Sequence, residues 1–272
     1  MVWICPICEL GLDRNTQGWS CVNQHSFDEA KEGYVNLLPA HQKRSKNPGD
    51  NLKMVQGRRT IHDSQLYQPL AEVLSSIVKQ YADSSALLDI GCGEGYYGGF
   101  IARTVPTVTL YGIDIAKSAV KLAAKTYCDQ HFAVAGARRL PVATSTIDLA
   151  MCIFSPSTDS EVARVLRSGG HYLEVGPAPS HLWELKTALY DQPHEHKALR
   201  RAVSGSTLTQ EGEVNYEKQL NNAQLRALID ATPFAFRGHR EKRAQLREQA
   251  SVTLTMSFSW RLFTQMKQPT TV

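Results

Sequence analysis

The sequence predicts an α/β fold, a mostly parallel sheet with helices on both faces that follows a small cysteine-rich module. Short apolar runs alternate with helical patterns from residue 86 to residue 175, as in chains that form parallel sheets. Three of the six cysteines lie within the first 21 residues. A chain of 272 residues is long enough for one large domain and one small module.

The composition indicates a folded protein without a membrane span. Hydrophobic residues make up 42% and charged residues 21% of the chain, which excludes the disordered and fibrous classes. No apolar run approaches the roughly 18 residues of a membrane span, and the N-terminus lacks a signal-peptide pattern, so we expect a cytoplasmic protein. The 30 Lys and Arg residues exceed the 26 Asp and Glu residues by four, which permits a nucleic-acid partner.

The chain divides into three predicted regions: a module over residues 1–38, a basic linker and first helix over 39–82, and the main domain over 83–272. Between His41 and His62, six basic residues accompany one acid. Such a run attracts phosphate groups, although a run of charges is usually only a solvated surface. The module and the run would together clamp RNA. The predicted RNA contacts are Lys43, Arg44, Lys46, Arg58 and Arg59.

Apolar periodicity predicts the elements in order. A helix is expected over residues 66–81. Strands are expected over 86–90, 108–113, 131–134, 147–153 and 171–175, with helices over 97–104, 117–127 and 159–166. The remaining chain predicts a helix over 181–190, a strand over 213–220, helices over 223–231 and 241–249, and a closing strand over 252–263.

The cysteine-rich module carries a predicted zinc site. Cys5, Cys8, Cys21 and His25 follow the spacing C-x2-C-x12-C-x3-H, which supplies three thiolates and one imidazole to a closed tetrahedral site. A module this small has few apolar residues, so one structural zinc ion would provide much of its folding free energy. Two roles stay open: the module recognises RNA, or it only caps the larger domain.

A glycine-rich loop follows the first predicted strand of the main domain. Gly91, Gly93 and Gly95 form a G-x-G-x-G pattern between a strand and a helix, where backbone amides can approach a ligand. Tyr96 stands where a dinucleotide fingerprint needs glycine, which disfavours NAD and allows a nucleoside joined to an amino acid. Asp114 ends the next strand and is placed to accept ribose hydroxyls, while Asp89 precedes the loop and would orient it.

These motifs resemble those of the class I S-adenosylmethionine-dependent methyltransferases. The segment LLDIGCGEGYY is similar to their first motif, GIDIAKSAVKLAAK to the second, and RRLPVATSTIDLAMCIFSP to the third and fourth. The full chain resembles the RlmA family of 23S rRNA guanine-N1 methyltransferases more closely, through CPIC, FDEAKEGYVNLLP, KRSKNPGD, QLYQPL and GPAPSHLWELK. This resemblance implies a Rossmann-like, seven-stranded, mostly parallel sheet behind an N-terminal zinc ribbon.

The resemblance also implies an activity and partners. Methyl transfer from S-adenosylmethionine would go to N1 of a guanine in the helix 35 hairpin loop of 23S rRNA, guanine 745 in the nucleotide numbering used for the family. A homodimer is expected, with two ribbons flanking the RNA. The four ribbon residues would hold zinc, and the implied cofactor contacts are Tyr67, the loop from Gly91 to Tyr96, Asp114 and His181.

One position departs from many class I enzymes. Gly136 stands where an acid often binds the adenine amino group. Adenine would therefore be held by backbone atoms and by Ile115 and Leu140.

Methylation of guanine also requires a proton acceptor, because guanine N1 carries a proton at neutral pH that has to leave during the reaction. Asp159 and His181 are the nearest titratable candidates by motif position, and neither is established as the base. A base taken out of an RNA stack would rest on aromatic rings, for which Tyr67, Tyr96, Phe154 and Phe234 are candidates, although each could equally be a core residue.

Two other functions remain open. A methyltransferase that acts on a small molecule would share the sheet and the glycine loop but has little use for a zinc ribbon and a basic run. A non-catalytic zinc-ribbon RNA-binding protein would have no need for Asp114 and the glycines, all of which are present.

Overall fold

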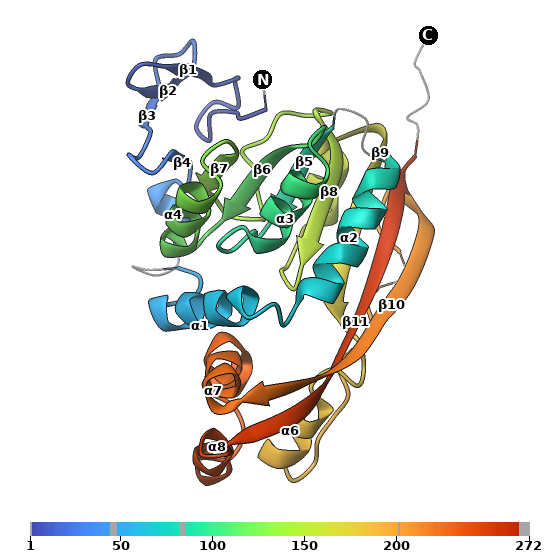
Figure 1. The fold of residues 1–272 in the computed structure, drawn as a ribbon. Coiled ribbons are helices and arrows are strands. Elements are labelled where there is room, and N and C mark those ends of the chain that lie inside the picture. The colour runs from blue at the N-terminus through green and yellow to red at the C-terminus, as the bar shows by residue number, and fades with distance from the viewer. Residues whose placement is uncertain (1, 44–47, 82–84, 201, 267–272) are drawn as a thin grey trace.

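The computed structural model describes residues 2–43, 48–81, 85–200 and 202–266. Its centre is an eight-stranded sheet in the order β10-β11-β9-β8-β5-β6-β7-β4 (Figure 1). Neighbours from β4 to β9 run parallel, and β9, β11 and β10 pair antiparallel. The predicted mostly parallel α/β sheet is confirmed.

The strands of the sheet are β4 (Tyr34–Asn36), β5 (Ala86–Ile90), β6 (Thr109–Asp114), β7 (His131–Val134), β8 (Ile147–Ile153), β9 (Leu166–Pro177), β10 (Ser206–Asn221) and β11 (Ser251–Gln265). The helices are α1 (Leu52–Asp63), α2 (Gln68–Tyr81), α3 (Tyr96–Thr104), α4 (Lys117–Thr126), α5 (Asp159–Val165), α6 (Trp183–Leu189), α7 (Asn222–Ala231) and α8 (Arg240–Arg247), with short 3-10 turns η1 (Ala40–Gln42) and η2 (Pro233–Ala235). No helix among the described residues combines the length and apolar character needed to cross a membrane.

The central strands are buried on both faces, which explains their nearly continuous apolar sequences. Successive residues of a strand point to opposite faces. Leu87 therefore joins the hydrophobic core on one side of the sheet, and Leu88 joins the core on the other. This burial fixes the positions of the loops that leave the carboxyl ends of the strands.

The N-terminal module contributes to the sheet as well as preceding it. Its small sheet consists of β1 (Asp13–Asn15), β2 (Gly18–Ser20) and β3 (Ser26–Asp28). The next strand, β4, instead pairs parallel with β7, so the main sheet has eight strands where the resemblance implied seven. The backbone N–H of Ile4 donates to Pro141 O at 3.0 Å. The predicted boundary at residue 38 stays a prediction, but the described contacts cross it.

The segment expected as a basic linker contains α1, a packed helix. Asn51 caps it by accepting the Met54 N–H at 3.0 Å. Gly57 lets α1 approach α7, because a Cβ atom there would lie 2.7 Å from Ala227 O. Ahead of the helix, Gly49 has a φ of +85° and packs closely on Ile115. Figure 1 shows α1 between the sheet and α7, so this segment covers the carboxyl edge of the sheet.

Candidate active site

The glycine-rich loop between β5 and α3 forms the floor of the site. Gly91, Gly93 and Gly95 have φ values of +80°, +56° and +83°, which side chains rarely tolerate. A Cβ atom at Gly91 would clash with the side chain of Ser155, which follows β8. The N–H of Gly91 donates to Ile113 O at 2.8 Å. The loop is therefore fixed against both neighbouring strands.

Asp114 lies at the end of β6 and binds the same loop. Its Oδ2 accepts the N–H of Gly93 at 3.0 Å, and its Oδ1 accepts the N–H of Ala116 at 2.7 Å. Burial raises the pKa of Asp114, although these backbone donors oppose the rise. Each carboxylate oxygen can accept a further hydrogen bond, so the geometry fits the predicted contact with ribose hydroxyls.

Asp89, also predicted as a cofactor residue, lies beneath the loop. Its side chain is buried and meets the backbone N–H of Gly98 in α3. Burial raises its pKa to about 8, and the nearby charge of Asp114 adds to the rise. The structure thus places Asp89 against the helix that follows the loop, where it can orient both.

Helix α1 supplies a pair that the sequence did not reveal. His62 Nδ1 lies 2.5 Å from Glu94 Oε1, and both side chains are buried. Although burial opposes it, the hydrogen bond from His62 and the charges of His62 and Arg58 lower the pKa of Glu94. The His62 ring stacks on Tyr96 at 4.0 Å. Because α1 was expected as linker, no signal marked His62 as a partner of the loop.

The predicted RNA contacts separate in the structure. Arg58 lies against the glycine loop, with Nη2 2.5 Å from Asp50 Oδ2 and Nη1 beside Gly93, and its side chain is 29% exposed. Arg59 is exposed and pairs with Asp63 at 3.6 Å. Lys43 is exposed after η1, whereas Arg44 and Lys46 lie outside the described residues.

An aromatic group stands beside the loop. Phe154 follows β8 with a φ of +54°, and 45% of the residue is exposed. Its ring lies 6.3 Å from Tyr67, 6.3 Å from Tyr97 and 5.6 Å from Phe258. Phe154 thus presents an accessible aromatic surface, supported from behind by three rings.

The other stacking candidates have different surroundings. Tyr67 is buried, and burial raises its pKa above the usual value for a phenol. One face of the Tyr96 ring is covered by the imidazole of His62, and burial raises the pKa of Tyr96 to about 12. Phe234 is buried in η2 and has Tyr190 as its ring neighbour at 6.5 Å, so the structure does not bring it to the group around Phe154.

His181 borders the aromatic group in a neutral state. Its ring lies 4.6 Å from Phe258, and its Nδ1 accepts the N–H of Ser257 at 3.2 Å. Burial, with the positive charges of His196 and Lys186, lowers the pKa of His181 to about 3. A neutral imidazole that accepts at Nδ1 carries its proton on Nε2 and can donate from there.

Asp159, the other candidate base, is engaged in an ion pair. It begins α5 and binds Arg200, which also contacts Glu174 at 3.0 Å. The Ser157 hydroxyl receives a further bond from Arg200 at 3.2 Å. Asp159 and Arg200 are both about a third exposed, so the pair lies at the edge of the core.

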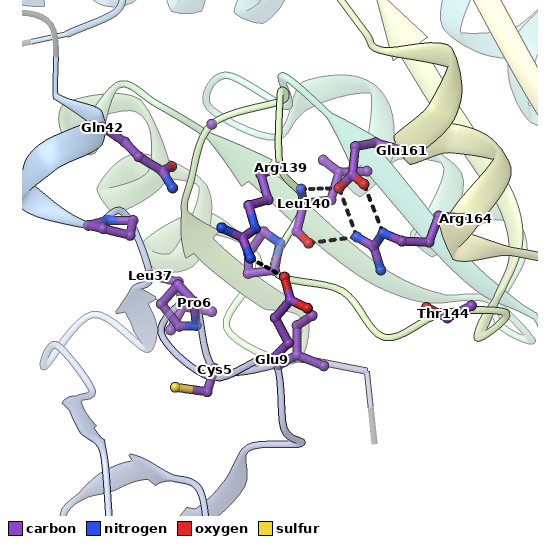
Figure 2. Close-up of a pocket in the computed structure, with 14 residues that line it drawn as sticks. Cys5, Pro6, Glu9, Leu37, Gln42, Arg139, Leu140, Thr144, Glu161 and Arg164 are labelled. Carbon is purple, nitrogen blue, oxygen red and sulfur yellow. Dashed lines mark hydrogen bonds and ion pairs between the residues drawn. The ribbon is translucent and has the colours of Figure 1, made fainter. Parts of the chain in front are cut away.

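The two residues expected around adenine have separate partners. Ile115 is half-buried under Gly49. Leu140 is buried, and its N–H donates to Glu161 Oε2 at 2.6 Å. Leu140 lines a cavity of about 250 Å³ between the module and the loop after β7. Figure 2 shows Leu140 among the lining residues, with Arg139 paired to Glu9. Leu140 therefore faces the N-terminal module as well as the sheet edge.

The four predicted zinc ligands converge. Their ligand atoms all lie within 4.8 Å of one another. The Sγ atoms of Cys8 and Cys21 are 3.6 Å apart, and His25 Nδ1 lies 3.5 Å from the Sγ atoms of Cys5 and Cys21. Tetrahedral zinc with ordinary bond lengths needs edges of roughly 3.8 Å between sulfurs and roughly 3.6 Å between sulfur and nitrogen. The donor set therefore fits a zinc ion.

Two family models match this chain. One, described as RlmA, N-terminal, covers residues 3–46, which hold the four converging ligands. The other, described as a methyltransferase domain, covers residues 87–170, which hold the glycine loop and Asp114.

Curated proteins and solved structures resemble the chain over greater lengths. The 23S rRNA (guanine(748)-N(1))-methyltransferase of Streptomyces fradiae is 34% identical over 68% of this chain and 66% of its own length. The Bacillus subtilis (strain 168) protein YxjB is 28% identical over 93% of both chains. The crystal structure of the YcgJ protein from Bacillus subtilis has a TM-score of 0.50 and 16% identity over 71% of this chain and 98% of that one, which shows likeness of fold.

Proposed function

Because the chain belongs to the RlmA family of S-adenosylmethionine-dependent methyltransferases, we propose that it methylates N1 of a guanine in the helix 35 hairpin loop of 23S rRNA. The observation that carries this proposal is the combination, in one chain, of a converged zinc-ligand set with a glycine loop bound to Asp114. The proposed nucleotide is guanine 745. Guanine 748, which the Streptomyces fradiae relative's name specifies, is the second candidate.

The site fits the cofactor. S-adenosylmethionine supplies a methyl group activated by a sulfonium. The left-handed loop exposes backbone to it, and Asp114 would hold the ribose hydroxyls. Tyr67, Tyr96, His181, Ile115 and Leu140 are proposed to complete the binding site. Of these, His181 would act as a donor through Nε2, because Ser257 occupies Nδ1.

The chain's own residues would position the guanine. Phe154 is the half-exposed member of the aromatic group, and its ring lies 6.3 Å from that of Tyr67, a proposed cofactor contact. An extruded guanine would therefore stack on Phe154. Asp159 is bound to Arg200, and His181 is neutral and accepts from Ser257 at Nδ1, so we assign removal of the N1 proton to neither of them. Catalysis would then rest mainly on holding N1 in line with the methyl group. As the N1–CH3 bond forms and the S–CH3 bond breaks, the N1 proton would pass to water and S-adenosylhomocysteine would leave.

The N-terminal module is proposed to recognise the hairpin. Zinc held by its four ligands would fix the module, and Lys43, Arg44, Lys46 and Arg59 would attract phosphates. A homodimer would place two modules around one RNA, in the cytoplasm. A methyltransferase for a small molecule would not need this module, and a non-catalytic binding protein would not need the Asp114 contacts with the loop.

The test is mass mapping of methylated guanines in 23S rRNA from strains with and without the gene. We expect one guanine to lose its N1-methyl group in the deletion strain, and a plasmid copy of the gene to restore it. A copy with Asp114→Ala should not. Loss at position 748 would correct the nucleotide, and no loss at any guanine would overturn the proposal.

A further inference from the structure

Arg58 is the protein group that stands over the middle glycine of the loop. Apart from the two adjoining residues of the chain, a Cβ atom built on Gly93 would have a single neighbour within 4 Å among the described residues, Nη1 of Arg58 at 3.4 Å. By contrast, a Cβ atom at Gly91 or Gly95 would meet packed side chains, those of Ser155 and Tyr127. The guanidinium of Arg58 is therefore the group that borders the position of a Cβ atom on Gly93.

The guanidinium is held in place by its own helix. Nη2 lies 2.5 Å from Oδ2 of Asp50, which stands just ahead of the cap of α1. Both side chains are 29% exposed, so the pair is partly shielded from water. The contact with Asp50 uses one edge of the planar group and leaves Nη1 directed at the loop. Arg58 can thus offer hydrogen-bond donors without reorganising.

The charges around Arg58 suit a ligand with both signs. Asp114 and Glu94 approach Arg58 closely enough for their charges to affect it. The amino-acid part of S-adenosylmethionine carries a carboxylate beside an ammonium and a sulfonium. One cation between acids matches that distribution, since the guanidinium can receive the carboxylate while the acids favour the positive groups.

We propose that Arg58 binds the carboxylate of the methionine part of S-adenosylmethionine, and that α1 therefore forms part of the cofactor site. This inference rests on the use of that cofactor and not on the identity of the RNA. A role in binding RNA phosphate would need the side chain to face solvent, as that of Arg59 does. If Arg58 served only to pair with Asp50, its removal would not distinguish a ligand that carries the carboxylate from one that lacks it.

The test compares two ligands that differ by one group. The full-length protein is titrated calorimetrically with S-adenosylhomocysteine and with its decarboxylated analogue. We expect the wild type to bind the carboxylate-bearing ligand about 10- to 100-fold more tightly, as a charge-assisted hydrogen-bonded pair allows. Arg58→Gln should weaken that ligand alone and bring the two affinities within about threefold. Arg58→Lys, which keeps the charge but loses the planar fork, should give an intermediate ratio.

Arg59→Gln is the matched control, because it removes the adjacent cation of the same helix. It should leave the ratio of the two affinities unchanged. An affinity ratio left unchanged by Arg58→Gln would overturn the inference. If the affinities for both ligands fall equally, Arg58 only shapes α1. If Arg58→Gln binds neither ligand because it misfolds, the ratio for Arg58→Lys decides.

The outcomes separate this inference from the proposed function. A wild-type protein that shows the ratio, in a strain pair that shows no change in 23S rRNA, would defeat the RNA proposal and leave Arg58 in its role. Normal guanine methylation in the cell, together with an affinity ratio that Arg58→Gln leaves unchanged, would overturn the role of Arg58 and leave the RNA proposal standing. A wild type that binds neither ligand would overturn both.

Discussion

The imidazole of His62 stacks on the ring of Tyr96, with centroids 4.0 Å apart and planes 10° apart, and its Nδ1 meets Glu94 at 2.5 Å. One side chain of α1 thus contacts both the glycine loop and the start of α3. Together with Arg58 it joins a helix that precedes the sheet to the loop after β5.

Removing His62 should destabilise the fold. His62→Ala leaves the Glu94 carboxylate buried without its closest partner, a change that costs roughly 3 kcal/mol or more in comparable buried pairs. Urea denaturation measures the loss in free energy of unfolding. The double variant with Glu94→Gln should recover part of it, because no unpaired charge remains. Strictly additive losses would contradict direct coupling between the two side chains.

The same pair predicts an acid dependence. The folded protein has a lowered pKa at Glu94, so the stability that its carboxylate provides is present above the ordinary value of 4.5 and is lost as the pH falls through the folded value. Thermal melting of wild type and Glu94→Gln at several acidic pH values measures this. The wild type should lose more stability on acidification than the variant, and parallel curves would refute the assignment.

Asp89 predicts the opposite direction. Its pKa rises from an ordinary value of 3.8 to about 8, so the folded state keeps a proton that the unfolded chain releases. The stability gained from this is complete below the ordinary value and is lost as the pH rises through about 8. Asp89→Asn mimics the protonated form. Its Tm should therefore exceed that of the wild type by more at pH of about 8 than at pH of about 5.

Phe154 should matter for RNA and not for the cofactor. Phe154→Ala removes the exposed ring, and loss of a stacked base should lower kcat/KM on a 23S rRNA hairpin by about 10- to 100-fold. Binding of S-adenosylhomocysteine should change less than about threefold. Phe236→Ala is the control, because Phe236 is the more exposed aromatic and lies near α8. Equal activity losses in the two variants would argue against stacking on Phe154.

Metal removal should affect the module more than the sheet. We expect one zinc ion per chain by elemental mass spectrometry and its loss in Cys8→Ser. Chelation should expose β1–β3 to amide exchange, while Trp3 and Val35 keep the adjoining core, because both pack with residues of the sheet. Cys128→Ser, at an exposed cysteine outside the module, should retain the metal. Retention of zinc by Cys8→Ser would contradict the ligand assignment.

The sequence predicted the parts of this molecule that depend on local pattern. The strand, the glycines and Asp114 follow a spacing that forces one geometry, as do the four metal ligands. The predicted strand over 147–153 matches β8. In these places backbone conformation and residue type are tied closely enough for the pattern alone to predict the contacts.

The parts that depend on tertiary packing were not predictable. Helix α1 is polar and contains Gly57, so its own pattern is weak, and it forms because Asn51 caps it and α7 covers it. The run of charges therefore groups Arg58 with the other predicted RNA contacts, although the helix turns it toward Gly93. Strand β4 has three residues and no alternation long enough to indicate that it would join β7.

The pairing of β4 with β7 fixes the position of the N-terminal module relative to the main sheet. In the register of this pair Tyr34 stands opposite Phe132 and Asn36 opposite Val134, and the loop that follows β7 leaves from the same end. A slip by one residue along the strands would displace the module by about 3.3 Å. The distance between the module and the glycine-rich loop is thus set by the hydrogen-bond register between β4 and β7.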